Sequence, residues 1–292
     1  MDHPPPIFDL TVPDDWTGII LGSPHSGRDF PDDFLAGTAL PRHLLRSSED
    51  ALLDHLAAAA PGLGMALLTA RVSRSVVDLN RAESELDPNL VDGVPRRPLG
   101  MRVQAGLGVL PRIVGAGRPI HPAGFRLTRD QAQDRLARYW HPYHRALAGL
   151  MDRARARFGT ALLIDLHSMP HEALAQTRPP LPDVVIGNRH GLSAAARFSD
   201  AVQTALESQG FRAARNTPFS GAHIASAHGD PRRGRHVIQL EFDRRLYLDD
   251  SGLQPGPGYA GFAARLNGFF AALRAIAPAG AQERLQGGIA AE

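Results

Sequence analysis

The sequence predicts an α/β fold with a mixed, mostly parallel sheet and helices on both of its faces. Two observations lead to this prediction. Short apolar runs closed by Gly, Pro or polar residues are typical of interior strands, and the longer amphipathic segments between them are typical of helices. Strands that alternate with helices along a chain favour a sheet covered by helices on both faces.

Apolar runs predict strands at six places in the chain. They span residues 18–22, 65–69, 75–79, 161–167, 183–188 and 236–245.

Amphipathic or alanine-rich segments predict four helices. They span residues 44–60, 128–159, 193–209 and 259–275. Thr128 with Gln131 three residues later is a capping-box pattern, so we expect a helix to begin there. Pro142 lies inside that helix and predicts a kink, because proline lacks the N–H that a helix interior needs. Ser193 is the expected N-cap of the next helix.

We expect a single α/β domain over residues 17–280. A proline-rich, extended arm would precede it at 1–16, and a tail at 281–292 would follow it. The stretch 83–122 is dense in Pro, Gly and Arg and has no periodic pattern. A loop of that length inside a compact domain is typically functional, so we interpret 83–122 as an active-site loop region.

Composition excludes several classes of protein and of site. The 32 basic residues, all arginine, nearly balance 30 acidic ones and form no basic run, which argues against a nucleic-acid partner. The absence of cysteine excludes disulfides, thiolate zinc sites and a cysteine nucleophile, so metal ligands must be His, Asp or Glu. No apolar run approaches the roughly 20 residues of a membrane span, and no signal peptide is visible. We therefore expect a cytoplasmic protein with no membrane partner; the sequence leaves its oligomeric state open.

Two histidines lie where predicted strands end. His25 follows the strand at 18–22, and His167 closes the strand at 161–167. Ligand sites of open α/β sheets form at the carboxyl ends of strands, so these imidazoles are a candidate metal pair. A catalytic zinc takes three protein ligands, often two His and one carboxylate. Glu49 and Asp50 are candidates for that carboxylate, although both could instead complement a helix dipole.

Other polar residues near strand ends leave alternatives open. Glu241 could be a general base for a metal-activated water, or it could pair with Arg244 or Arg245. Arg81 could bind a substrate carboxylate through two hydrogen bonds, or it could cross-link the sheet edge. Asp165 is assigned to the face of its strand opposite His167, from which it could still orient an imidazole.

A second histidine pair competes as a metal site. His141 and His144 have helical i, i+3 spacing, which suits a metal. However, Pro142 disturbs the helix between them, and no adjacent Glu supplies a base.

Seven motifs occur in a fixed order over most of the chain. They are SPHSG at 23–27, SED at 48–50, SRSVVDLNR at 73–81, GLGVLPRI at 106–113, YWHPYH at 139–144, LIDLHSMP at 163–170 and HVIQLEFDRRLY at 236–247. This series resembles the N-formylglutamate amidohydrolases. The resemblance implies a zinc-peptidase/phosphorylase-hydrolase-like fold related to carboxypeptidases and aspartoacylases. It also implies one Zn²⁺ per chain and hydrolysis of N-formyl-L-glutamate to formate and glutamate, a step of histidine degradation.

The resemblance also implies ligands for the zinc ion. His25 and His167 fall on zinc ligands, and Asp50 is our choice for the third ligand, with Glu49 as its alternative. Relatives commonly carry a glutamate ligand three residues after the first histidine, where this chain has Arg28.

The same resemblance implies two roles in catalysis and substrate binding. Glu241 is similar to the catalytic glutamate, and Asn80 and Arg81 are similar to a clamp for the substrate carboxylate. Arg112 is our own candidate for stabilising the oxyanion, and Ser26 and His144 are further candidates for substrate binding. The segment GAHIASAHG at 221–229 lacks an aromatic residue and an arginine that the deformylases of the family carry there.

Three further interpretations compete with the deformylase. The chain could be a zinc hydrolase of another N-acyl amino acid or a carboxypeptidase-like peptidase. It could also be a non-catalytic binding protein for a small molecule on the same fold. An arginine-rich nucleic-acid binder is the third, which the missing basic run disfavours.

Overall fold

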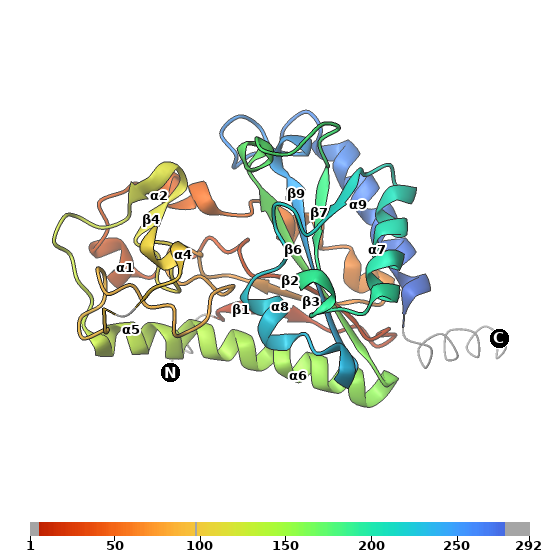
Figure 1. Cartoon of the computed structure of the whole chain (residues 1–292), viewed down its shortest axis with the longest axis horizontal. Coiled ribbons are helices and arrows are strands. Elements are labelled where there is room, and N and C mark those ends of the chain that lie inside the picture. The colour runs from red at the N-terminus through yellow and green to blue at the C-terminus, as the bar shows by residue number, and fades with distance from the viewer. Residues whose placement is uncertain (1–5, 97, 278–292) are drawn as a thin grey trace. The chain divides into compact units, whose positions relative to one another are not determined.

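A seven-stranded sheet is the larger of two sheets (Figure 1). The computed structural model describes residues 6–96 and 98–277 of the 292-residue chain, so the predicted tail at 281–292 and the first five residues of the predicted arm lie outside it. The strand order is β1-β3-β2-β6-β9-β7-β8, and β4 and β5 form a separate two-stranded sheet. The strands are β1 Phe8–Thr11, β2 Ile19–Ser23, β3 Ala66–Ala70, β4 Ile113–Val114, β5 Arg118–Pro119, β6 Ala161–Met169, β7 Val184–Gly187, β8 Ala213–Arg215 and β9 Arg235–Asp243.

The sheet is mixed and mostly parallel, as predicted. Parallel pairs join β2 to β6, β6 to β9 and β7 to β8, whereas β7 runs antiparallel to β9. Every residue of β2, β3, β6 and β7 is buried, which explains why their sequences are nearly continuous apolar runs. The polar side chains inside these central strands are therefore the exceptions that need a chemical explanation.

Helices connect and cover the strands. They are α1 Asp32–Ala36, α2 Arg42–Leu45, α3 Leu53–Leu56, α4 Met101–Gln104, α5 Arg129–Arg135, α6 His141–Phe158, α7 Ala196–Ser208, α8 His223–His228 and α9 Tyr259–Leu273. The capping box predicted at Thr128 and Gln131 is present at the start of α5. The irregularity predicted at Pro142 is a π-helical turn, Leu136–Trp140, that lies between α5 and α6. A proline without an N–H cannot complete the regular i to i−4 ladder, which accounts for the irregular turn before it.

Helices lie on both faces of the sheet. Phe198 of α7 packs on His236, and Phe262 of α9 packs edge-to-face on Phe242. His236 and Phe242 occupy alternate positions of β9 and so share a face, over which α7 and α9 lie side by side (Figure 1). Gln239 points to the opposite face, where it accepts a hydrogen bond from the backbone N–H that precedes α8.

Three local predictions were wrong. Residues 75–79 form turns instead of a strand, and the predicted helix 44–60 is broken into short pieces that include α2 and α3. Leu52 has φ 64°, a left-handed conformation that no regular helix accommodates. Ser193 does not cap α7, because its hydroxyl donates to the carbonyl of Val237. The N–H of Ala195, the N-cap residue, is instead donated to Nδ1 of His236.

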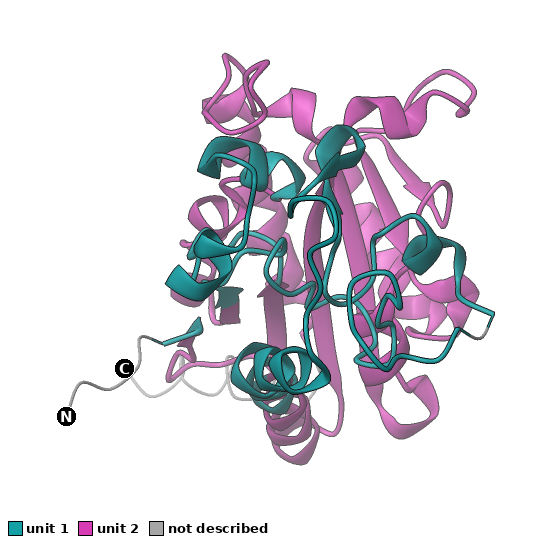
Figure 2. Ribbon diagram, turned by 90° about the vertical axis from the view of Figure 1, so that its left-hand side faces the viewer, with its two compact units in different colours: residues 1–9, 24–49, 69–146 teal, residues 10–23, 50–68, 147–292 magenta. Residues whose placement is uncertain are grey.

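The chain divides into two compact units (Figure 2). One comprises residues 1–9, 24–49 and 69–146, and the other residues 10–23, 50–68 and 147–292. The second unit holds most of the large sheet together with α7, α8 and α9. Part of the predicted extended arm is β1 of this sheet, and the assignment of 17–280 to one domain stays a prediction. Within the described ranges, no helix has both the length and the apolar character needed to cross a membrane.

His236 predicts an acid-sensitive fold. Burial and the charge of Arg197 lower the pKa of His236 to about 4, whereas an unfolded histidine titrates near 6.5. Between pH 6.5 and pH 4, His236 is protonated in the unfolded chain but neutral in the folded chain. The free energy of unfolding therefore has its full value above pH 6.5 and decreases as the pH falls towards 4. We expect a loss of up to about 3 kcal/mol from this group. Denaturant unfolding of wild type and His236→Gln at pH 7 and pH 4.5 measures it, and equal pH dependence in both would contradict the prediction.

Candidate active site

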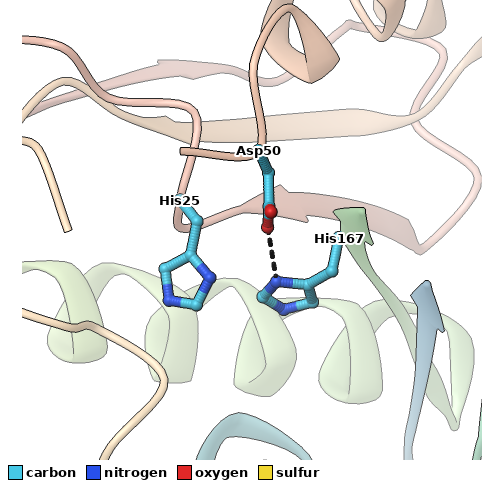
Figure 3. A group of neighbouring side chains, drawn as sticks. All are labelled: His25, Asp50 and His167. Carbon is cyan, nitrogen blue, oxygen red and sulfur yellow. Dashed lines mark hydrogen bonds and ion pairs between the residues drawn. The ribbon is translucent and has the colours of Figure 1, made fainter. Parts of the chain in front are cut away.

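Two imidazoles and one carboxylate gather at the carboxyl ends of β2 and β6. His25, Asp50 and His167 are all buried, and each offers one ligand atom within 4.8 Å of the others (Figure 3). His167 lies in β6, and His25 follows β2 by two residues. The parallel register pairs Gly22 of β2 with Asp165 of β6, so both strands deliver their next residues to the same edge. The structure thus brings the predicted metal pair together.

Asp50, not Glu49, points to the histidine pair. Oδ2 of Asp50 lies 3.0 Å from Nδ1 of His167. Glu49 instead forms a two-point ion pair with Arg46, with Nε to Oε2 at 2.6 Å and Nη2 to Oε1 at 2.9 Å. Consecutive residues of an extended segment point in opposite directions, which separates the two carboxylates.

Each imidazole is held by a further carboxylate through its other nitrogen. Nε2 of His25 lies 2.8 Å from Oδ1 of Asp78, and Nε2 of His167 lies 3.0 Å from Oδ2 of Asp165. Such carboxylates fix the ring orientation of metal-binding histidines and raise their basicity. The assignment of Asp165 to the opposite face was wrong, because residues two apart in a strand point to the same side. Sequence reasoning missed the role of Asp78, although it noted the segment that contains this residue.

Strong electrostatic fields act on these groups. Burial would lower the pKa of His167, but Asp165, Asp50 and Glu241 outweigh it and raise that pKa well above its usual value. A cluster of carboxylates that favours a proton on an imidazole also favours a metal cation in the same place.

Beside His25, the group with the shifted pKa is the carboxyl group of Asp78. Burial would raise the pKa of Asp78, but the charges of Arg74, His25 and Arg81 together hold it well below its usual range. Asp78 is therefore a fixed anion beside His25. It can stabilise positive charge transferred to the ring by a metal.

Glu241 lies beside His167 in the sheet. The two residues are register partners on the parallel strands β9 and β6. Nε2 of Gln239 donates to Oε1 of Glu241 at 2.8 Å, which orients the carboxylate. Arg244, which we considered as its salt-bridge partner, contacts Asp50 instead, at 3.0 Å. The position of Glu241 next to a candidate metal ligand fits a general base.

Arg81 is a buried cation held by backbone carbonyls. Its Nε donates to the carbonyl of Leu107 at 3.1 Å and its Nη1 to that of Asn80 at 3.0 Å. Burial lowers the pKa of Arg81, and the charge of Asp78 opposes this effect. A buried guanidinium that donates to backbone carbonyls fits the binding of an anionic substrate group.

The remaining candidates have other surroundings. Nε2 of His144 lies 2.9 Å from the carbonyl of Leu79, and Nε2 of His141 lies 3.4 Å from Glu83, so the structure does not join these two histidines in a metal group. Arg112 forms an ion pair with the buried Asp87, with Nε to Oδ2 at 2.9 Å. The predicted substrate-binding residues Ser26 and Asn80 are buried.

A buried donor set of two imidazoles and one carboxylate, beside a glutamate on a mostly parallel sheet, defines a candidate metal-dependent hydrolase. Comparison with known proteins supports a hydrolase of amide bonds. The family model described as N-formylglutamate amidohydrolase matches residues 17–248, so the chain belongs to the N-formylglutamate amidohydrolase family. The family predicted from the ordered motifs is confirmed.

Individual relatives give the extent of the similarity. The chain is 32% identical over 235 residues to an N-formylglutamate deformylase of Pseudomonas aeruginosa and 28% identical over 234 residues to one of Pseudomonas putida. Each match covers 80% of this chain and 82% of the relative. A crystal structure of an N-formylglutamate amidohydrolase from Ralstonia eutropha superposes with TM-score 0.85 at 32% identity, covering 92% of this chain and 98% of that one. A protein from Agrobacterium tumefaciens, at 15% identity and TM-score 0.63, shares the fold.

Proposed function

We propose that this protein hydrolyses the formyl amide of N-formyl-L-glutamate to formate and glutamate with the help of a bound zinc ion. The observation that carries the proposal is the buried group of His25, Asp50 and His167 in a member of this family. The relatives named above as N-formylglutamate deformylases support the substrate. The cytoplasmic location stays a prediction.

The donor set fits zinc and one ion per chain. Two histidines with one carboxylate are the ligands of a common class of catalytic zinc sites, which keep a further position open for reactants. Asp78 and Asp165 hold the two rings through Nε2, so Nδ1 of each ring is the nitrogen for the metal. A zinc ion held there would polarise the amide carbonyl and make water a nucleophile near neutral pH.

Glu241 is the proposed proton carrier. Its carboxylate would take a proton from the attacking water and then deliver it to the nitrogen of the leaving amine. The hydrogen bond from Gln239 fixes one carboxylate oxygen, so the proton has a defined site. Arg112 stays the candidate for stabilising the oxyanion, although its ion pair with Asp87 would have to accommodate that role.

Arg81 is the proposed anchor for a substrate carboxylate, and its removal gives a prediction. Arg81→Met should lower kcat/KM for N-formylglutamate by about 10²–10³-fold, mainly through KM, because the anionic substrate loses a buried cation. Steady-state kinetics measure the change, and Arg129→Met, an exposed arginine at the start of α5, is the control. An unchanged KM in a folded Arg81→Met variant would contradict the anchor role.

A substrate panel on zinc-loaded protein tests the proposed function. We expect N-formylglutamate to be cleaved at least about 10²-fold more efficiently than N-formylalanine, since a site built to bind the side-chain carboxylate strongly rejects an analogue that lacks it. N-acetylglutamate keeps both carboxylates and adds one methyl group to the acyl carbon, so it tests the size of the acyl group that the site accepts, and a dipeptide tests peptidase activity. A preference for N-acetyl substrates would indicate another N-acyl amino acid hydrolase, and a preference for dipeptides a peptidase. Binding without turnover of any member would indicate a non-catalytic protein.

A further inference from the structure

We propose that Arg244 and Ser168 together hold Asp50 as a one-oxygen metal ligand and thereby set the affinity and coordination number of the metal site. This inference rests on the proposed function, because it takes Asp50 as a ligand. From sequence, Arg244 is a possible partner of Glu241, and Ser168 has no predicted role. Both are positioning residues in this proposal, since they act through Asp50.

The two oxygens of Asp50 have different surroundings. Oδ1 accepts hydrogen bonds from Nη2 of Arg244 at 3.0 Å and from the hydroxyl of Ser168 at 3.2 Å. Oδ2 lies 3.0 Å from Nδ1 of His167, on the side where the candidate ligand atoms converge. The arrangement therefore occupies Oδ1 with protein donors and directs Oδ2 to the metal position.

Arg244 also contacts Ser168, so the three residues form a closed set of hydrogen bonds. Nε of Arg244 lies 3.1 Å from the Ser168 hydroxyl, whose hydrogen points to Asp50. The guanidinium thus spans two acceptors with two different nitrogens, a geometry that the ammonium of lysine does not reproduce. The Asp50 side chain is 1% exposed and that of Arg244 is 16% exposed, so water competes little for these bonds.

Two neighbouring strands, β6 and β9, position Ser168 and Arg244 beside Asp50. Ser168 follows His167 in β6, and Arg244 follows directly after β9, the parallel neighbour of β6. Because side chains alternate along a strand, Ser168 points away from the face that carries His167 and towards Asp50 from another direction. Asp50 is therefore held from two adjacent strands.

Arg244 has two opposing effects on metal binding. Its positive charge repels the metal cation, whereas its hydrogen bond to Asp50 orients a metal ligand. Partners that orient a metal ligand typically change metal affinity 10–100-fold when removed. The hydrogen bonds to Oδ1 also prevent Asp50 from rotating to offer both oxygens. We infer that orientation dominates, and that loss of Arg244 weakens metal binding in spite of the repulsion that is removed.

Metal affinity and a cobalt spectrum test this inference. Zn²⁺ dissociation constants of wild type, Arg244→Met, Arg244→Lys and Ser168→Ala are measured by competition with a chromogenic chelator. Arg244→Met should weaken Zn²⁺ binding by about 10–100-fold. Ser168→Ala should weaken it less, and Arg244→Lys should not restore the wild-type value. In the Co²⁺-loaded proteins, release of Oδ1 should raise the coordination number and so lower the intensity of the visible absorption bands.

Arg245→Met is the matched control, because Arg245 is the adjacent arginine, is exposed, and donates its backbone N–H to Asp243. Wild-type affinity and cobalt spectra in Arg244→Met and Ser168→Ala would overturn the inference, as would tighter binding in Arg244→Met or full rescue by lysine. If Arg244→Met does not fold, Ser168→Ala and Arg244→Lys still decide the question. Failure of the wild-type protein to bind Zn²⁺ would refute the proposed function instead.

Discussion

Replacing His167 by alanine will lower kcat/KM by about 10³-fold or more, because the metal contributes several kcal/mol to stabilising charge in the transition state. His167 is a buried member of the candidate metal group. Its two nitrogens face Asp50 and Asp165, each at 3.0 Å, and its side chain is 3% exposed.

Metal content and activity should fall together in this variant. Metal analysis after dialysis should show about one equivalent of zinc in wild type and far less in His167→Ala, and chelation of wild type should remove activity that added zinc restores. His55→Ala is the control, because His55 has a 58% exposed side chain outside the site. Full activity of His167→Ala, or of wild type stripped of metal, would show that the reaction does not use this group.

The strand ends explain why the histidines of the candidate metal group stand out in the sequence. A buried parallel strand needs a long apolar run, so the polar residues that close β2 and β6 stand out, and both strands deliver them to one edge of the sheet. His25 and His167 are visible in this way without any knowledge of the fold. The residues alone left Asp50 and Glu49 open and the family resemblance favoured Asp50; in the structure Asp50 lies beside His167, whereas Glu49 pairs with Arg46.

The partners of these ligands could not be predicted in the same way. Asp78 reaches His25 across 53 positions of sequence, from a stretch that local propensity assigned to a strand and that forms turns. Arg244 reaches Asp50 across 194 positions. Such contacts depend on tertiary packing, which also overrides the helix propensity of the alanine-rich segment 44–60. Hydrophobic periodicity predicts the structure of one segment, whereas each of these contacts joins two segments that are far apart in the sequence.

The second large effect is expected for Glu241→Gln, which should lower kcat by about 10²–10⁴-fold. Glutamine keeps the size of glutamate and one acceptor oxygen for the hydrogen bond from Gln239, but it cannot take a proton from water. Because Glu241 is a neighbour of His167 and not a member of the ligand group, zinc content should stay near that of wild type. This combination distinguishes a lost base from a lost metal.

Kinetics at saturating zinc and substrate, with metal analysis of the same samples, check this prediction. Glu207→Gln is the matched control, because Glu207 is an exposed residue of α7 that accepts a hydrogen bond from Gln203, much as Glu241 accepts one from Gln239. KM should change less than kcat, since the substrate carboxylate is assigned to Arg81. Near-normal turnover of a folded, zinc-loaded Glu241→Gln would assign the proton to another group, whereas loss of zinc in that variant would place Glu241 among the ligands.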